Sequence, residues 1–334
     1  MKIAVVGAGA IGGYLGVRLA DSGEDVTFIA RGANLAAIRA DGMKLILEDG
    51  SELRAQDARA FERMSDAGPQ DVILLTLKAH QVAAVAPELK HLCHRQTSVV
   101  TMQNGIPWWY FHKHGGHYEG APVVSADPDG SIARNIDTGR VIGSVVYPAA
   151  TLIAPGVVQL IEGNRFSLGE LDGTATPRIE ALAASFTKAG FKAPITKDLR
   201  SEIWLKLWGN LSFNPISALT HATLVDICQF PLTRDLAAQM MAEAEAIAQK
   251  LGINFRISIE RRIAGAEKVG AHKTSMLQDV EQGRPIEIEA LAGSVVELGR
   301  LTRTPTPSIS AVYACASLLA KTLNARHAKL TLDA

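Results

Sequence analysis

The first thirteen residues constrain the fold of this chain more than any other stretch. The run from 3 to 6 is apolar, as in strands that are buried on both faces, and an apolar helical segment follows it. Between them stand Gly7, Gly9 and Gly12, which have the G-x-G-x-x-G spacing. This spacing between a strand and a helix is typical of a dinucleotide-binding turn. The alternative is a glycine-rich turn that binds no nucleotide.

Each of these glycines has a distinct expected role. Gly7 permits the tight turn out of the strand, Gly9 lets the backbone approach a pyrophosphate, and Gly12 lets the helix pack closely on the sheet. The start of the helix offers free N–H groups to an anion. The predicted cofactor-binding residues of this segment are therefore Gly7, Gly9, Ala10, Ile11 and Gly12.

The bulk composition is that of an ordinary globular protein. The 334 residues are 47% hydrophobic, and 34 basic residues balance 34 acidic ones. A zero net charge argues against nucleic acid as the main partner. No apolar run reaches the ~18 residues of a membrane span, so we expect no membrane partner either. Three well-separated cysteines indicate reduced thiols and a cytoplasmic protein.

Strands and helices alternate in the first half of the chain, which predicts an α/β Rossmann-type domain with a parallel sheet. Asp49-Gly50 between two short strands indicates a hairpin. We expect two later strands, 141–147 and 156–161, to extend the same sheet. The other expected strands are 25–30, 43–47, 52–56, 71–77 and 98–102, and the expected helices are 33–40 and 80–91.

From about residue 198 the apolar pattern has helical periodicity, which predicts an all-helical C-terminal domain. We place the dinucleotide-binding domain at 1–195 and the helical substrate domain at 196–334. A crevice at the carboxyl ends of the strands would then hold the ligands. The expected helices are 198–213, 222–228, 231–251, 256–268, 285–302 and 308–323.

Three polar residues follow predicted strands. A site specific for NAD(H) expects an acidic residue after the second strand, whereas this chain has Arg31. A guanidinium suits a 2′-phosphate, so we predict NADPH/NADP+ as cofactor; the alternative is a solvated surface arginine. Lys78 and Asn104 follow the next two strands of the predicted sheet, where the ribose and nicotinamide would lie. They could equally be a solvent-facing lysine and a turn asparagine.

A polar stripe crosses an otherwise apolar helix. Lys206, Asn210 and Asn214 recur at intervals of four, which places them on one helix face. A partly desolvated ammonium can act as a general acid, and the amides can hold a carboxylate or hydroxyl. The alternative is that Lys206 pairs with Glu202 on a solvated face. Further on, Ser275 and Glu287 could merely mark helix starts.

These segments together resemble the 2-dehydropantoate 2-reductase (ketopantoate reductase) family over nearly the whole chain. The segments are the glycine turn, Lys78 with Gln103-Asn104-Gly105, Lys206 with Asn210, and Ser275 to Asp279 followed by Glu287. The resemblance implies a Rossmann domain followed by a helical domain like that of 6-phosphogluconate dehydrogenase. It also implies reduction of 2-dehydropantoate to (R)-pantoate by NADPH, on the pathway to pantothenate.

The resemblance assigns roles to the polar residues. Arg31 and Lys78 would bind the cofactor, and Asn104 would lie at cofactor and substrate. Lys206 would be the general acid, and Glu287 would orient the substrate or tune this lysine. The predicted substrate-binding residues are Asn104, Asn210, Asn214 and Ser275.

Two departures from the family pattern leave the substrate open. The aromatic and histidine-rich segment 108–120 and Glu289, where the family has aspartate, could fit another 2-oxo acid. A protein that senses NADPH without turnover is a further alternative. We expect no metal, because His112, His114 and His117 lack the second half of a zinc signature. The apolar helix 308–323 can be core or the face of a homodimer.

Overall fold

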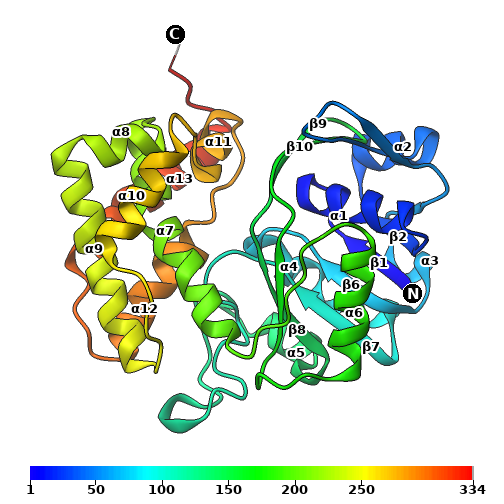
Figure 1. Cartoon of the computed structure of the whole chain (residues 1–334), viewed down its shortest axis with the longest axis horizontal. Helices are drawn as coiled ribbons and strands as arrows, with labels where there is room; N and C mark the ends of the chain where they lie inside the picture. Colours follow the sequence, from blue (N-terminus) through cyan, green and yellow to red (C-terminus); the bar gives the residue numbers. More distant parts are fainter. Residues whose placement is uncertain (333–334) are drawn as a thin grey trace. The chain divides into compact units, whose positions relative to one another are not determined.

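The computed structural model describes residues 1–332, and the chain folds into two compact units (Figure 1). The first unit contains residues 1–103, 111–122 and 129–199. The second contains the chain from Arg200 on, together with two short segments, 104–110 and 123–128. Among the described residues, no helix is long and apolar enough to cross a membrane.

A seven-stranded sheet forms the centre of the first unit, as the α/β prediction requires. Its strand order is β11-β8-β7-β6-β1-β2-β5, and only the edge strand β11 is antiparallel to its neighbour. The strands are β1 (Lys2–Val6), β2 (Asp25–Ile29), β5 (Arg59–Phe61), β6 (Gln70–Leu75), β7 (Cys93–Thr101), β8 (Val141–Val146) and β11 (Phe166–Glu170).

The order of the strands reverses beside β1. The chain runs from β1 outward through β2 to β5, and then returns to place β6 on the other side of β1. Val6 at the end of β1 pairs with Ile29 of β2 and with Leu75 of β6. The turns that follow these three strands therefore share one edge of the sheet, the usual ligand-binding point of such folds.

Helix α1 (Ala10–Asp21) packs between this sheet and a second one of four strands, in the order β4-β3-β10-β9. A Cβ at Gly13 would lie 2.3 Å from Met43 of β3, and one at Gly16 would lie 2.3 Å from Phe28 of β2. Because Gly13 and Gly16 lack side chains, α1 can pack closely against the side chains of both sheets. The second sheet consists of β3 (Met43–Ile46), β4 (Glu52–Ala55), β9 (Ala149–Ala154) and β10 (Val157–Glu162).

The second sheet corrects one prediction. Strand 141–147 does extend the main sheet as β8, but strand 156–161 is β10, which pairs with β3 and β9 instead. Its alternation of buried and exposed residues fits a sheet covered by α1 on one face only. The predicted hairpin around Asp49-Gly50 is confirmed as the antiparallel pair β3 and β4.

Short helices complete the first unit. The predicted helix 80–91 changes at Ala86 from α to 3₁₀, where Pro87 cannot donate an α-helical hydrogen bond. The helices are α2 (Gly32–Asp41), α3 (Met64–Ala67), α4 (Ala79–Val85), η1 (Ala86–Leu92), η2 (Gly116–Tyr118), α5 (Ser131–Asn135), η3 (Thr138–Arg140) and α6 (Pro177–Lys188).

The described part of the second unit is helical, as predicted. Several predicted helices have other bounds. The helix α7 continues through Pro215 to Thr220, and the segment 285–302 becomes helical only at Ile288 and begins with a π turn. The predicted helix 256–268 begins three residues later, and the predicted helix 308–323 ends three residues later. The helices are α7 (Leu199–Thr220), α8 (Leu224–Gln229), α9 (Pro231–Lys250), α10 (Ile259–Val269), α11 (Ser275–Glu281), the π turn η4 (Glu289–Gly293), α12 (Ser294–Leu301) and α13 (Pro307–Arg326).

Two buried tryptophans fix α7 in this unit. The indole N–H of Trp204 donates to the hydroxyl of Tyr110 over 2.7 Å, and that of Trp208 donates to the carbonyl of Met241 over 2.7 Å. The ring of Trp208 also stacks on Phe255, with 4.1 Å between the ring centroids. The indoles of Trp204 and Trp208 therefore both have a hydrogen bond, and the rotation of α7 about its axis is set.

Candidate active site

The glycine turn after β1 has the geometry expected of a phosphate-binding turn. Gly7 has φ +106°, which favours glycine, and its carbonyl accepts a hydrogen bond of 2.8 Å from the hydroxyl of Thr76. A Cβ at Gly12 would lie only 2.1 Å from that same carbonyl oxygen. A Cβ at Gly9, by contrast, would meet nothing within 4 Å. Gly7 and Gly12 are therefore needed by the fold itself, whereas Gly9 faces open space that a ligand could use.

The N-terminus of α1 is open to an anion. Its N-cap is Gly9, which has no side chain to occupy the first N–H groups. The amide of Asn34 braces the turn, because it donates to the carbonyl of Ala8 over 2.6 Å and accepts from the N–H of Gly156 over 2.7 Å. Sequence reasoning missed Asn34 and Thr76. Their only signal is that each lies just beyond the end of a strand beside β1.

The polar residues that follow the neighbouring strands lie at the same edge of the sheet as the glycine turn. Arg31 is exposed directly before α2, at the carboxyl end of β2. Lys78 is half-buried after β6, and its backbone N–H donates to the side chain of Gln81. The amide of Gln103 donates to the carbonyls of Leu75 and Leu77, which ties the end of β7 to that of β6. These features fit a dinucleotide with a 2′-phosphate.

A second group of polar residues lies within the helical unit. The Nζ of Lys206 donates a hydrogen bond of 2.7 Å to the Oδ1 of Asn104. Burial lowers the pKa of Lys206 from 10.5 to about 8, although the negative charge of Glu287 acts in the opposite direction. The structure thus brings together three of the predicted site residues. The result is an ammonium group that is more acidic than an ordinary lysine.

The polar stripe is preserved in α7. Lys206 and Asn210 are half-buried, and Asn214 is buried one turn further on. Beside the stripe, Gly209 is in direct contact with Arg262 of α10, whose guanidinium nitrogen would lie 1.9 Å from a Cβ at this position. A positive charge therefore lies against the backbone of α7 next to Asn210. No pattern in the sequence indicates this contact.

Ser275 differs from the other predicted substrate residues. It is exposed at the first position of α11, and the described contacts do not join it to Lys206. The helix cap is the neighbouring Thr274, whose hydroxyl accepts from the N–H of Leu277. Asp279 forms an ion pair with Arg284 over 2.8 Å. These contacts stabilise the start and end of α11, and none of them involves the side chain of Ser275.

The aromatic part of segment 108–120 packs inside the protein. Trp109, Tyr110 and Phe111 are buried. The guanidinium of Arg200 lies over the ring of Tyr110, 5.7 Å from its centroid, and donates to the carbonyl of the same residue over 2.9 Å. These contacts and the hydrogen bond from Trp204 show that the buried side chain of Tyr110 packs against α7.

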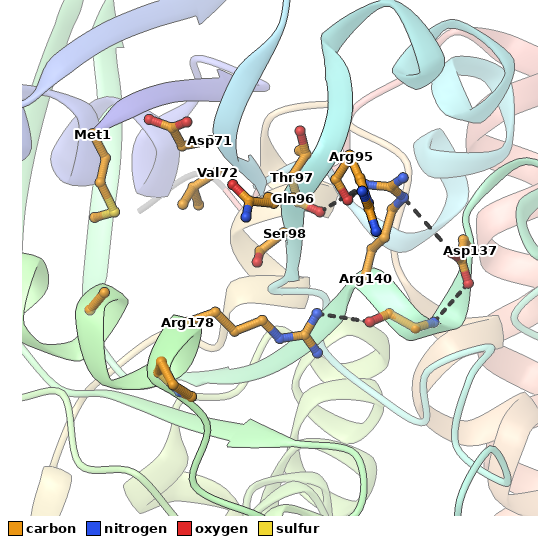
Figure 2. A pocket seen from close by; sticks show the side chains of 13 residues that line it. Met1, Asp71, Val72, Arg95, Gln96, Thr97, Ser98, Asp137, Arg140 and Arg178 are labelled. Atoms are coloured by element: carbon orange, nitrogen blue, oxygen red, sulfur yellow. Dashed lines mark hydrogen bonds and ion pairs between the residues drawn. The ribbon is translucent and has the colours of Figure 1, made fainter.

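A hollow of about 650 Å³ opens elsewhere on the first unit (Figure 2). It lies at the amino ends of the strands, where Met1, Asp71 and Arg95 are found, and thus at the edge opposite the glycine turn. Two of its arginines are held by the protein. Arg140 donates to the carbonyl of His94 over 2.7 Å, and Arg178 pairs with Glu170. We therefore do not assign the hollow to the cofactor.

Comparison with known sequences assigns the chain to a family. The family described as ketopantoate reductase PanE/ApbA matches residues 3–173, and its C-terminal counterpart matches residues 198–320. The chain belongs to the ketopantoate reductase family. It is therefore an oxidoreductase, and NADPH is the cofactor of its family. The ketopantoate reductase fold, a Rossmann-like domain with a helical C-terminal domain, agrees with the two units described above.

Individual relatives cover almost the whole chain. A 2-dehydropantoate 2-reductase from Mesorhizobium japonicum is 54% identical over 321 residues, which are 96% of this chain and 98% of the relative. A solved structure from Ralstonia solanacearum MolK2 is 40% identical with a TM-score of 0.92, and the match covers 97% and 98% of the two chains. The structure of 2-dehydropantoate 2-reductase from Geobacter metallireducens is 28% identical with a TM-score of 0.83, over 95% and 99%.

Proposed function

We propose that this chain reduces 2-dehydropantoate to (R)-pantoate with NADPH, and that Lys206 is the general acid. The observation that carries the proposal is the cluster of Lys206, Asn104 and Glu287 in the helical unit. A sensor of NADPH would have no need of an acidified lysine with an amide and a carboxylate beside it. The 54% identity to a curated 2-dehydropantoate 2-reductase supports the choice of substrate.

The glycine turn and its neighbours would bind the cofactor. The N–H groups of Ala10, Ile11 and Gly12 would hold the pyrophosphate, and the open space beside Gly9 would admit it. Arg31 would pair with the 2′-phosphate. It is exposed and lies just after the carboxyl end of β2, the strand that pairs with β1. Lys78 would contact the ribose or the nicotinamide of the cofactor.

The chemistry requires one hydride and one proton. NADPH supplies the hydride to C2 when it is bound. As negative charge grows on the carbonyl oxygen, Lys206 would donate the proton from Nζ to that oxygen, which completes the alcohol and leaves a neutral amine that takes a new proton from water. With a pKa of about 8, this lysine is mostly protonated at neutral pH. Proton donation of this kind contributes about 10²–10⁴ to a rate.

The remaining polar residues would orient the substrate. Asn104 holds the ammonium of Lys206 and would face the substrate with the rest of its amide. Asn210 and Asn214 continue the same face of α7 and would bind the hydroxyl and carboxylate. Ser275 would hold the carboxylate, a role that rests on the family resemblance alone. Glu287 would keep Lys206 protonated through its charge.

The deciding experiment is steady-state NADPH oxidation with a panel of 2-oxo acids that includes 2-dehydropantoate. We expect 2-dehydropantoate to give the highest kcat/KM. A faster branched or aromatic 2-oxo acid beside negligible turnover of 2-dehydropantoate would replace the substrate and retain the chemistry.

The sensor alternative is tested with Lys206→Ala. We expect kcat to fall about 10²–10⁴-fold while the affinity for NADPH stays within about twofold. Lys250→Ala is the matched control, because this lysine belongs to the same unit and bonds only to the carbonyls of Thr302 and Arg303 in the described contacts. Unchanged kcat in Lys206→Ala would remove this lysine as the acid.

Whether the helix 308–323 is core or the face of a homodimer is a separate question of assembly. The molar mass of the purified protein in solution would decide it, since a single chain has 35.6 kDa. A cytoplasmic location likewise stays a prediction.

A further inference from the structure

The π turn η4 lies in the same unit as Lys206 and begins two residues after Glu287. The N–H of Ser294 reaches back five residues to the carbonyl of Glu289, which is the wider spacing of a π-helix. Single π turns of this kind are rare, and they insert one residue into a helix at some cost in stability. This one therefore needs a structural reason.

The carbonyl of Ala290, inside the turn, accepts two hydrogen bonds from outside the helical ladder. The hydroxyl of Ser294 donates to it over 2.7 Å, and the backbone N–H of Ile106 donates over 3.2 Å. Ile106 belongs to the segment 104–110 and comes from a distant part of the sequence. The π turn thus presents a carbonyl that pairs with this segment.

Gly105 makes the approach possible. Its φ is +90°, a conformation that favours glycine, and a Cβ here would lie 2.0 Å from the oxygen and 2.6 Å from the carbon of the Ala290 carbonyl. Both obstacles are backbone atoms, which cannot turn aside as a flexible side chain could. The glycine and the π turn therefore fit each other in this unit.

The residue before Gly105 is Asn104, whose amide oxygen accepts the hydrogen bond from Lys206. At the other side of the contact, the N–H of Leu291 donates to the carbonyl of Glu287 over 3.2 Å. One backbone contact, between Gly105 and Ala290, thus adjoins two groups that act on the ammonium, the amide of Asn104 and the carboxylate of Glu287.

We propose that Gly105 and the π turn η4 form a positioning device for the general acid, in which the Ala290 carbonyl fixes the amide oxygen of Asn104 on the ammonium of Lys206. In the described contacts, neither Gly105 nor Ala290 bonds to Lys206. Both act through Asn104. The inference rests on the proposed function of Lys206, and its test is chosen so that the two can fail separately.

The test is a double-mutant cycle of Gly105→Ala and Asn104→Ala, with kcat measured against pH for 2-dehydropantoate and NADPH. An acceptor on the ammonium favours the charged form of Lys206, so its loss lowers the pKa of this lysine. We expect each single variant to lower kcat about 10-fold and to move the alkaline limit of activity to lower pH. The double variant should be no worse than Asn104→Ala alone, because Gly105 acts through that residue.

Additive losses of kcat, or an alkaline limit that does not move in Gly105→Ala, would overturn the positioning role. If Lys206→Ala retained its kcat, the proposed function would fall instead, whatever the outcome of the cycle. A merely structural role of Gly105 would reduce kcat by one factor at every pH and would leave its pH profile in place.

Ser294→Ala provides a milder variant in case Gly105→Ala does not fold. It removes one of the two donors to the Ala290 carbonyl, and we expect a smaller shift of the alkaline limit in the same direction. The matched control is Ser212→Ala, since Ser212 is also fully buried and its hydroxyl donates to a helix carbonyl four residues back, that of Trp208. An equal response of the two serine variants would overturn the proposal.

Discussion

Lys206 and Asn104 are 102 residues apart in the chain, and the ammonium of the first donates a hydrogen bond of 2.7 Å to the amide oxygen of the second. An amide oxygen stabilises an ammonium without neutralising it, so the proton stays available for transfer. Glu287 adds a negative charge that acts on the same lysine. Burial thus lowers the pKa of Lys206 and the charge of Glu287 raises it, while the amide of Asn104 accepts a hydrogen bond from the charged form.

The pH dependence of catalysis should follow the pKa of Lys206. The acid must be protonated, so kcat is retained below about pH 8 and lost as the pH rises through that value. Glu287→Gln removes a charge that raises this pKa, and the alkaline limit should therefore move down by about 1 pH unit. The check is kcat against pH for both proteins. An unmoved limit with a uniformly lower kcat would mean that Glu287 orients the substrate instead.

Arg31 should determine the preference for NADPH. Arg31→Ala removes a charge-assisted hydrogen bond to the 2′-phosphate, so the KM for NADPH should rise about 10–100-fold while that for NADH hardly changes. Arg95→Ala is the control, because this arginine is exposed on the same unit but lies at the opposite edge of the sheet. Equal effects on NADPH and NADH would show that Arg31 does not read the phosphate.

Alanine variants of the turn glycines should distinguish effects on NADPH binding from effects on the stability of the fold. At Gly9 a Cβ meets open space, so Gly9→Ala should change the free energy of unfolding by less than about 1 kcal/mol and weaken NADPH binding at least 10-fold. At Gly12 a Cβ meets the Gly7 carbonyl, so Gly12→Ala should cost about 1–3 kcal/mol of stability as well. Urea unfolding and a fluorescence titration with NADPH measure both. Normal NADPH affinity in Gly9→Ala would contradict this use of the open space.

Gly209 should respond to alanine differently from other helical glycines. At Gly265 of α10 a Cβ would meet no atom within 4 Å, so Gly265→Ala should stabilise the protein by about 1 kcal/mol through helix propensity. At Gly209 the methyl group displaces the guanidinium of Arg262, which should cancel that gain. Thermal unfolding of the two variants is the comparison. Equal stabilisation would mean that Arg262 moves aside freely.

Local patterns in the sequence predict most of the first unit correctly. The strand, turn and helix of the first twenty residues need only neighbouring residues for their definition, and the same holds for the hairpin around Asp49-Gly50. The pattern of 156–161 correctly predicts a strand, but the predicted partners are wrong. Which sheet a strand joins depends on residues more than a hundred positions away, here those of β3.

The site is predictable in part for the same reason. The spacing of Lys206, Asn210 and Asn214 is local to one helix, whereas the contact of Lys206 with Asn104 depends on the fold of the whole unit. The π turn and the contact of Gly209 with Arg262 have no signature in a single sequence, because π and α turns use the same residues. The predicted helix 198–213 stops short of Pro215, whereas α7 continues through this proline to Thr220, and residues 211–218 are buried.

The division of the chain into units has a consequence for its modularity. The helical unit includes the segments 104–110 and 123–128, which are encoded within the sequence of the nucleotide-binding unit. The first supplies the hydroxyl that accepts from the indole of Trp204, and the second is held by Glu297 through the N–H groups of Val124 and Ser125. A gene fragment that starts near residue 196 lacks both. The helical unit therefore cannot be exchanged between relatives as one continuous segment. A chimera that exchanges it must also include the segments 104–110 and 123–128.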